Sequence, residues 1–357
     1  MTRDRIVVAM SGGVDSAVAA ARCVQAGYDV VGISLRLARN GAGSCCSLDD
    51  FHDARAVADR LGFPHYVFEM TEEFDTHVVQ PFVAEYLAGR TPNPCARCNQ
   101  HVKFDLLWRR ARELGATRLA TGHYARIATH PDTGRPVLRA AADLAKDQSY
   151  FLFTLREREL ERTSFPIGDL TKTQVRAEAM ALGLPVADKP ESMEVCFVSS
   201  AGAAAFVEAH ATPAALRPGA IVDETGSVVG QHTGVHRFTI GQRRGLGLAD
   251  GKAPRYVRAL DAVTGTVTVG AAPDGTRGLT ARDVSWSSGT PPVAGSTIDV
   301  RVRHRHALVP SRVEPTGDDS ARVVFDRPGP AVTPGQAAVF YQRDLVLGGG
   351  WIAGEIA

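Results

Sequence analysis

The sequence of 357 residues has no run of about 18 consecutive apolar residues, so it predicts no membrane-spanning helix. Its first residues, Met-Thr-Arg-Asp-Arg, lead into only a short apolar strand, without the hydrophobic region or the cleavage site of a signal peptide. We therefore expect a cytoplasmic protein with no membrane partner. Excess charge is also missing, because 40 Lys and Arg residues balance 39 Asp and Glu residues to a net charge of +1. A nucleic-acid partner would be bound by local basic patches rather than by a globally basic surface.

Two common phosphate-binding motifs are absent as well. The chain contains no G-x-x-x-x-G-K-[ST] and no G-x-G-x-x-G, which argues against a Walker P-loop and against a dinucleotide fingerprint. Cysteine is scarce, and in a cytoplasmic chain the six residues favour thiol chemistry or metal binding over a disulfide framework. They are Cys23, Cys45, Cys46, Cys95, Cys98 and Cys196. Cys23 has helical spacing from Ala19 and Ala20 and is most simply a small core residue.

What is present fits a globular protein of two or three domains, with 44% hydrophobic and 22% charged residues. Strand patterns at 6–9, 30–35, 65–68 and 118–121 alternate with helix patterns at 17–24, 49–61, 71–87 and 103–114. This alternation predicts an α/β fold with a doubly wound parallel sheet, which binds ligands at the carboxyl ends of its strands. Ser11, Leu35, Gly122 and His123 would all lie there.

The second half has a different texture, because helix patterns give way to short alternating segments between glycines and prolines. Residues 265–269, 298–302 and 321–325 are examples, and they predict antiparallel strands in small barrels or sandwiches. We expect three domains: a catalytic α/β domain at 1–204, a small mainly-β domain at 205–277 and a barrel-like domain at 278–357.

The most informative segment is Ser11-Gly12-Gly13-Val14-Asp15-Ser16, which follows the strand at 6–9 and precedes the helix at 17–24. A strand, a glycine turn and a helix start in this order form a phosphate cradle, because the glycines allow close approach and the N–H groups at the helix start face the anion. Asp15 would repel phosphates unless it holds a cation, so we expect it to be a Mg²⁺ ligand on a nucleotide. A plain glycine-rich turn with a capping serine is the alternative interpretation.

A second informative segment, residues 90–99, carries Cys95 and Cys98 as a C-x-x-C between two helix patterns. Its two prolines predict a rigid exposed loop that joins neither helix. A zinc site lacks a second pair of ligands in the sequence, and a thioredoxin-type pair belongs at a helix start in another topology. Use of the thiols as nucleophiles is the favoured interpretation, helped by the nearby cations Arg97 and Lys103.

Seven motifs occur in a fixed order: SGGVDS at 11–16, TPNPCARCNQHVKF at 91–104, ATGHYAR at 120–126, KDQSYFL at 146–152, ESMEVCFV at 191–198, IGQRRGLG at 240–247 and TPGQAAVFY at 333–341. The first motif resembles the PP-loop of ATP pyrophosphatases, which cleave ATP between the α- and β-phosphates. Together the motifs resemble the bacterial tRNA-specific 2-thiouridylase family over essentially the full chain. The resemblance implies an ATP-dependent transferase, a tRNA-uridine 2-sulfurtransferase. Such an enzyme replaces the position-2 oxygen of the wobble uridine by sulfur and releases AMP and pyrophosphate.

The resemblance also implies how sulfur is delivered. Cys196 matches the cysteine that carries sulfur as a persulfide, received from a cysteine desulfurase or a sulfur-relay protein. Cys98 matches the second catalytic cysteine, which attacks the persulfide to release sulfur or forms a disulfide bond with Cys196 as sulfur leaves. Some members carry aspartate where this chain has Cys95, so an iron–sulfur cluster on Cys95, Cys98 and Cys196 is the less favoured alternative to the persulfide route.

The same matching assigns the binding residues. ATP is expected at Ala9, Met10, Ser11, Gly12, Gly13, Val14, Asp15, Ser16, Leu35 and Gly122. The target base would be surrounded by Asn93, Pro94 and Cys95, and His123 would contact tRNA. Further tRNA contacts are expected at Lys146, Asp147, Gln148, Arg303, His304, Arg305 and Gln336. An anticodon base cannot be modified in place, so we expect it to be splayed into the pocket while the outer domains grip the RNA.

Two other functions compete with thiolation. Another PP-loop adenylating enzyme, such as an amidotransferase or a small-molecule ligase, would not need Cys98 and Cys196 together. A nucleotide-regulated RNA-binding protein without catalysis would use its cysteines only structurally.

Overall fold

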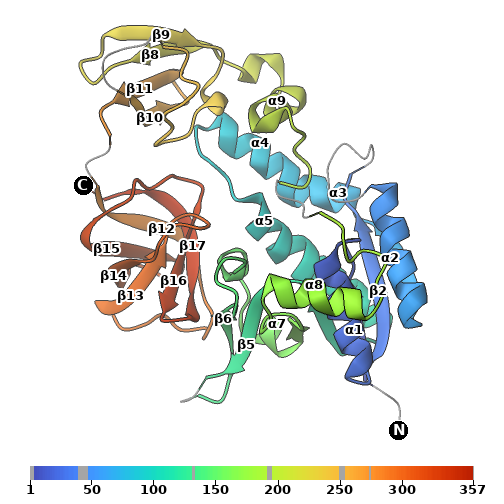
Figure 1. Ribbon diagram of the computed structural model, residues 1–357. Helices are drawn as coiled ribbons and strands as arrows, with labels where there is room; N and C mark the ends of the chain where they lie inside the picture. Colours follow the sequence, from blue (N-terminus) through green and yellow to red (C-terminus); the bar gives the residue numbers. More distant parts are fainter. Residues whose placement is uncertain are drawn as a thin grey trace.

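The computed structural model describes residues 4–38, 47–130, 133–190, 195–248, 254–272 and 275–356, so Cys45 and Cys46 lie outside the described residues. Three parts follow one another along the chain (Figure 1): an α/β part, a small β part at the upper left, and a barrel below it. None of the described helices is long and apolar enough to cross a lipid bilayer.

A five-stranded parallel sheet organises the α/β part, as the sequence predicts. Its order is β3 (His65–Glu69), β2 (Asp29–Arg36), β1 (Arg5–Ala9), β4 (Arg118–Thr121) and β7 (Thr163–Ser164). Every neighbouring pair of these strands is parallel. Successive strand residues face opposite sides, so Ile6 and Val8 of β1 pack in one hydrophobic cluster and Val7 in another. The sheet is therefore covered on both faces.

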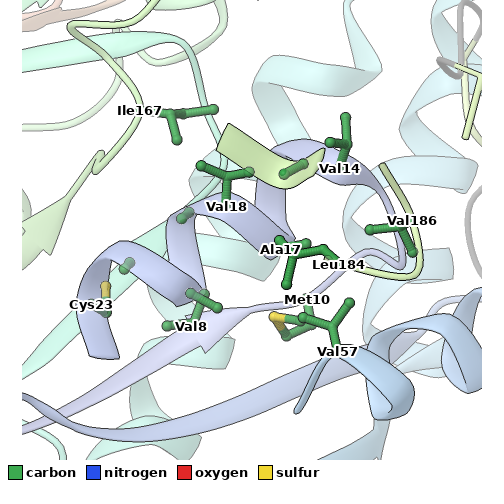
Figure 2. Packing of buried hydrophobic residues seen from close by; sticks show 14 of the residues in the cluster. Val8, Met10, Val14, Ala17, Val18, Cys23, Val57, Ile167, Leu184 and Val186 are labelled. Atoms are coloured by element: carbon green, nitrogen blue, oxygen red, sulfur yellow. The ribbon is translucent and has the colours of Figure 1, made fainter. Parts of the chain in front are cut away.

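The first cluster lies between β1 and three helices, α1 (Val14–Gln25), α2 (Leu48–Leu61) and α8 (Lys172–Ala181). Figure 2 shows Cys23 of α1 on the side of Val8 of the strand, and Val18 on the side of Ile167. Cys23 is a buried packing residue, as expected, and burial raises the pKa of its thiol to about 12. Such a thiol is inert at neutral pH.

The thiol-bearing segment differs from the prediction. Pro94 begins helix α5 (Pro94–Arg97), which continues as the π-helix η2 (Cys98–Leu106) and as α6 (Leu107–Glu113). The expected exposed loop is therefore wrong from Pro94 onward. Asn93 caps the helix, with its Oδ1 3.2 Å from the backbone nitrogen of Ala96. A proline suits the first helical position because that residue has no N–H partner inside the helix.

The preceding helical segment is found where it is predicted, at 71–87, but it is not uniform. It runs as α3 (Thr71–Phe74), the π-helix η1 (Asp75–Val79) and α4 (Gln80–Leu87). Short elements complete the α/β part: η3 (Ser149–Phe151) and α7 (Glu157–Glu161).

The small β part begins after helix α9 (Gly202–His210) and contains a four-stranded sheet with its own core. Its strands lie in the order β10 (Tyr256–Asp261), β11 (Thr266–Gly270), β8 (Gly219–Val222) and β9 (Val228–His232). Two short helices flank these strands, η4 (Pro213–Ala215) and η5 (Val235–Arg237).

The C-terminal part is a closed antiparallel barrel, as the sequence predicts. Its strands lie in the order β12 (Thr276–Trp286), β15 (Ser320–Gly329), β14 (Val309–Pro315), β13 (Ser296–Arg301), β16 (Ala337–Gln342) and β17 (Leu345–Glu355). The pairing of β12 with β17 closes it. A hairpin from the α/β part, β5 (Ala125–Thr129) and β6 (Pro136–Ala140), joins this sheet through β17, which no sequence pattern predicts.

A buried ion pair joins the barrel to the α/β part. Arg301 Nη1 lies 3.0 Å from Asp147 Oδ2, and the two side chains are only 16% and 1% exposed. The Asp147 carboxylate also accepts hydrogen bonds from the backbone nitrogens of Ala141 and Ser149, each at 3.1 Å. The Arg301 guanidinium lies 5.1 Å from the ring centre of Tyr341. The carboxylate is thus shielded from water, and the guanidinium is largely buried.

Removing the cation from this pair should destabilise the protein. Arg301→Met leaves the Asp147 carboxylate buried without its countercharge, and we expect the free energy of unfolding to fall by about 3 kcal/mol. The matched control is Arg312→Met, because the Arg312–Asp326 pair of the same barrel is 3.7 Å long and exposed. Its loss should cost less than about 1 kcal/mol. Urea denaturation of the two variants measures the difference, and equal losses would contradict the expectation.

Candidate nucleotide and thiol site

The loop after β1 is shaped by its own hydrogen bonds. Helix α1 begins at Val14, and Gly13 precedes it with extended backbone and no side-chain cap. The Ser16 hydroxyl donates to the Gly13 carbonyl at 3.0 Å and accepts from the Ser11 N–H at 3.2 Å. These bonds fold the loop against the first turn of the helix, whose N-terminus carries a positive partial charge. The loop therefore has the shape and polarity of an anion cradle.

Two glycines in this region are required by close packing. Gly12 has φ +70°, and a Cβ there would lie 2.3 Å from the Asp50 carbonyl oxygen. A Cβ on Gly122, just after β4, would lie 2.6 Å from the Ser16 nitrogen. Gly122 therefore sets how closely β4 approaches the loop. Gly13 is different, because its Cβ would meet only Ser11 Oγ at 3.5 Å.

Asp15 is held by residues that the sequence analysis missed. Lys172 Nζ donates to its two carboxylate oxygens at 2.7 and 2.8 Å, and the Tyr124 hydroxyl donates at 2.8 Å. Lys172 is the first residue of α8, which Thr171 caps. It is 157 residues away from Asp15, so no local spacing could indicate the pair. Tyr124 lies inside the ATGHYAR motif, and that motif was the available signal.

A second lysine lies near the same loop. Lys189 Nζ is 2.7 Å from Asp50 Oδ1 and 2.5 Å from Asp53 Oδ2. Burial alone would raise the pKa of Asp50, but the hydrogen bonds from Lys189 and Ser47 outweigh it and lower that pKa. Asp50 is therefore ionised at neutral pH, and its salt bridge ties α2 to the segment that leads toward Cys196.

A cavity of about 350 Å³ lies at the carboxyl ends of β1, β2 and β4. Many of the predicted residues line it: Ala9, Met10, Ser11, Asp15, Ser16, Leu35, Pro94, Cys95, Cys98, Gly122, His123, Gln148 and Cys196. Other predicted residues do not: Gly12, Gly13, Val14, Asn93, Lys146, Asp147, Arg303, His304, Arg305 and Gln336. The phosphate loop and the cysteines thus share one cavity.

Three cysteines differ in burial around this cavity. Cys98 is 8% exposed at the start of η2, Cys196 is half-buried on the segment 195–198, and Cys95 is exposed. Cys98 and Cys196 also belong to one hydrophobic cluster, together with Phe197. A half-buried thiol suits a group that must meet both an outside donor and an enclosed substrate. The buried thiol of Cys98, in the same cluster, suits a step that takes place inside the cavity after the first thiol has reacted.

The described residues contain no group of three or more His, Cys, Asp or Glu side chains arranged to hold a metal ion. Cys95, Cys98 and Cys196 line one cavity without forming such a group, so their arrangement does not fit an iron–sulfur cluster. Mg²⁺ makes smaller demands, because it is commonly held by one or two carboxylates and by substrate phosphates. Asp15 fits that role once Lys172 releases the Asp15 carboxylate and binds a phosphate instead.

His123 is buried in the cavity wall. Its Nδ1 lies 2.6 Å from Thr121 Oγ1, so the ring position is fixed by a hydrogen bond. Burial, and to a smaller extent the charge of Lys103, holds the pKa of His123 well below its ordinary value of 6.5. At neutral pH it is a neutral imidazole, which can contact a ligand through hydrogen bonding or stacking but not through charge.

The KDQ residues that were expected to bind tRNA have other partners in the structure. The Asp147 side chain is enclosed by its pair with Arg301, so its buried carboxylate offers no surface for RNA. Gln148 Oε1 accepts from the Tyr124 N–H at 2.9 Å, beside the cavity. Lys146 is half-buried.

The residues of the barrel that were expected to contact tRNA also differ in their partners and exposure. Gln336 Nε2 donates to the carbonyls of Thr91 and Pro92, each at 3.0 Å, and so holds the segment that leads to α5. The His304 ring packs on Phe151, with ring centres 4.5 Å apart. Arg303 donates to Thr333 Oγ1 at 3.1 Å and is half-buried, whereas Arg305 is exposed and has φ +65°.

Comparison with known proteins agrees with this architecture. Residues 4–200 match the family model described as tRNA methyl transferase HUP domain. Residues 204–271 match the tRNA methyl transferase PRC-barrel domain, and residues 276–352 match the aminomethyltransferase beta-barrel domain. The parallel sheet, its phosphate loop and the two following β parts thus define a HUP-domain protein, and two of its three matching models are named for tRNA methyl transferase.

Curated relatives narrow this class. The chain is 49% identical to a tRNA-specific 2-thiouridylase MnmA of Solibacter usitatus, over 99% of this chain and 100% of the relative. It is 49% identical to one of Geotalea uraniireducens (98% and 95%) and 50% identical to one of Geobacter metallireducens (98% and 97%). The chain belongs to the tRNA-specific 2-thiouridylase family.

The two loop glycines should respond differently to substitution. Gly12→Ala places a Cβ against the Asp50 backbone at a positive φ. We expect the free energy of unfolding to fall by at least about 1 kcal/mol, and ATP binding to weaken. Gly13→Ala should keep both, because its backbone is extended and its Cβ has room. Thermal unfolding with and without ATP measures both effects. Equal behaviour of the two variants would contradict this geometry.

Proposed function

We propose that this protein is a tRNA-uridine 2-sulfurtransferase that uses ATP and a cysteine persulfide. The observation that carries the proposal is the single cavity that contains both the phosphate loop and the thiols of Cys98 and Cys196. The 49% identity to two curated thiouridylases, over 98–99% of this chain, supports it. Nucleotide chemistry on the oxygen and sulfur chemistry on the carbon bonded to it require this closeness.

The first step activates the uracil oxygen. The position-2 oxygen attacks the α-phosphorus of ATP, a new O–P bond forms, and the bond to the β-phosphate breaks. Pyrophosphate then leaves into the cradle formed by Ser11 to Ser16. Lys172, held 2.7 Å from Asp15 before ATP binds, supplies a positive charge for the phosphates. AMP on the oxygen is a good leaving group, whereas the oxygen itself is not.

The second step delivers sulfur. The outer sulfur of a Cys196 persulfide attacks C2 of the base, and AMP leaves with the oxygen. Cys98 then attacks Sγ of Cys196, and the electron pair of the broken S–S bond goes to the sulfur that remains on the base. If Cys98 instead attacks first, hydrosulfide is released and adds to C2. Both orders end in a Cys98–Cys196 disulfide, which an external dithiol must reduce before the next turnover.

Mg²⁺ would be held by Asp15 and by the phosphates, and when bound it would offset the negative charge that gathers in the loop. We place tRNA on the face that carries Arg303 to Arg305, with the wobble base splayed into the cavity. Asn93 and Pro94 would border the base from the start of α5, with Cys95 beside it. A cysteine desulfurase or a sulfur-relay protein would load Cys196.

A methyl transferase function is the alternative that the name of the family model raises. The cavity favours thiolation, because Cys98 and Cys196 line it together with residues of the phosphate loop. Incubation with ATP, tRNA, a persulfide donor and a methyl donor such as S-adenosylmethionine separates the two. Formation of AMP, pyrophosphate and 2-thiouridine supports the proposal, and a methylated nucleoside would contradict it.

Separate variants should stop separate steps. Cys196→Ser should release pyrophosphate normally but accept no labelled sulfur and form no 2-thiouridine. Cys98→Ser should accept sulfur on Cys196 and fail to release it. The control is Cys23→Ala, because Cys23 lies in the core away from the cavity and should leave both steps intact. Pyrophosphate release and nucleoside mass spectrometry measure the steps, and 2-thiouridine from Cys196→Ser would refute the assignment.

RNA binding should depend on salt partly through Arg305, an exposed arginine of the barrel. Each phosphate contact contributes roughly 0.7 to 0.9 to the log–log salt slope, so Arg305→Ala should weaken tRNA binding and flatten the slope by about that amount. The control is Arg322→Ala, whose exposed side chain pairs with Glu314 on a neighbouring strand. Filter binding over a salt series gives both slopes. An unchanged slope for Arg305→Ala would remove this residue from the interface.

A further inference from the structure

Asn99 lies in the cavity wall, directly after Cys98 in the sequence. It is only 2% exposed, although its side chain is fully polar. The residue sits in the π-helix η2, which begins at Cys98. Wide helical turns of this kind are uncommon and occur often at functional sites.

One half of the Asn99 amide is satisfied and the other is not. Nδ2 donates to the Phe151 carbonyl at 3.0 Å. Oδ1 is buried and has no hydrogen-bond partner among the residues that the structure describes. Reversing the amide would place the oxygen against the Phe151 carbonyl, and two acceptors repel each other. The bond to Phe151 therefore fixes the side chain with an unused acceptor.

A buried acceptor without a partner is costly, by about 1–3 kcal/mol, and native proteins contain few of them. Asn99, Phe151 and Cys98 all line the same cavity, so a ligand there is the natural partner for Oδ1. That ligand must donate a hydrogen bond. Phosphates, which only accept at neutral pH, are excluded as partners of this atom.

We propose that Asn99 Oδ1 accepts a hydrogen bond from N3–H of the target uracil and thereby selects uracil over cytosine. This inference rests on the proposed function. Uracil presents a donor at N3, whereas cytosine presents a lone pair there, which Oδ1 would repel. When the base enters and stacks on Phe151, its N3–H reaches Asn99 Oδ1 and donates the hydrogen bond that this oxygen lacks. Because N3 is bonded to C2, the same contact holds C2 on the side of the cavity where Cys98 lies.

The test removes the donor from the base and the acceptor from the protein. Full-length protein is titrated, without ATP, with tRNA that carries uridine or 3-deazauridine at the wobble position, since the latter lacks the N3–H at nearly unchanged shape. The wild type should bind the deaza tRNA about tenfold more weakly, the value of one hydrogen bond to a buried group. Asn99→Ala should bind both tRNAs equally.

Two further variants separate recognition from misfolding. Asn99→Leu keeps the size of the side chain without its polar atoms and should also bind both tRNAs equally, and Gln100→Ala, a half-buried neighbour that does not line the cavity, should behave as the wild type. A tenfold penalty that persists in Asn99→Ala would overturn the inference, as would no penalty in the wild type. Because binding is measured without catalysis, a missing 2-thiouridine product would count against the proposed function alone.

Discussion

The segment that leads into α5, the helix of Cys95, is held from outside by the barrel through hydrogen bonds to its backbone. Gln336 binds the carbonyls of Thr91 and Pro92, and the Thr91 nitrogen donates to the Pro334 carbonyl at 2.9 Å. Backbone groups just before a proline-started helix have few partners of their own, so the position of α5 depends on these bonds. The buried Asp147–Arg301 pair fixes the same barrel to the same part of the chain. The barrel therefore helps to place Cys98 in the cavity, besides any contact that it makes with RNA.

The cavity divides into two chemical environments. The phosphate side has a helix start, small residues and Lys172, which suit a multiply charged leaving group. The thiol side is formed by aromatic and aliphatic residues, in which a sulfur nucleophile keeps little hydration. A neutral His123 lies in the wall without adding charge. A base placed across the two would have its oxygen near the nucleotide and its carbon near the sulfur, which is the order of events that the proposed reaction needs.

The sequence predicts the features that depend on local pattern. Short apolar runs indicate the strands at 6–9, 30–35, 65–68 and 118–121, and apolar alternation indicates the barrel strands at 298–302 and 321–325. The glycine turn was found because its backbone needs are local. Contacts over long separations left no such pattern: Lys172 with Asp15, Arg301 with Asp147, and the β6–β17 pairing. Pro94 was misread because proline both ends and begins helices, and only the cap from Asn93 decides which.

The β6–β17 pairing has a consequence for how the protein comes into being. Arg139 pairs with Leu345, and the core that contains Val7 and Leu119 also contains Trp351 from the last strand. During synthesis the α/β part leaves the ribosome long before the strand that completes its core. It must wait with an apolar surface uncovered, a state that chaperones bind and that aggregates readily. Truncation of the final strand would therefore destabilise the nucleotide-binding half, which is distant from that strand in sequence.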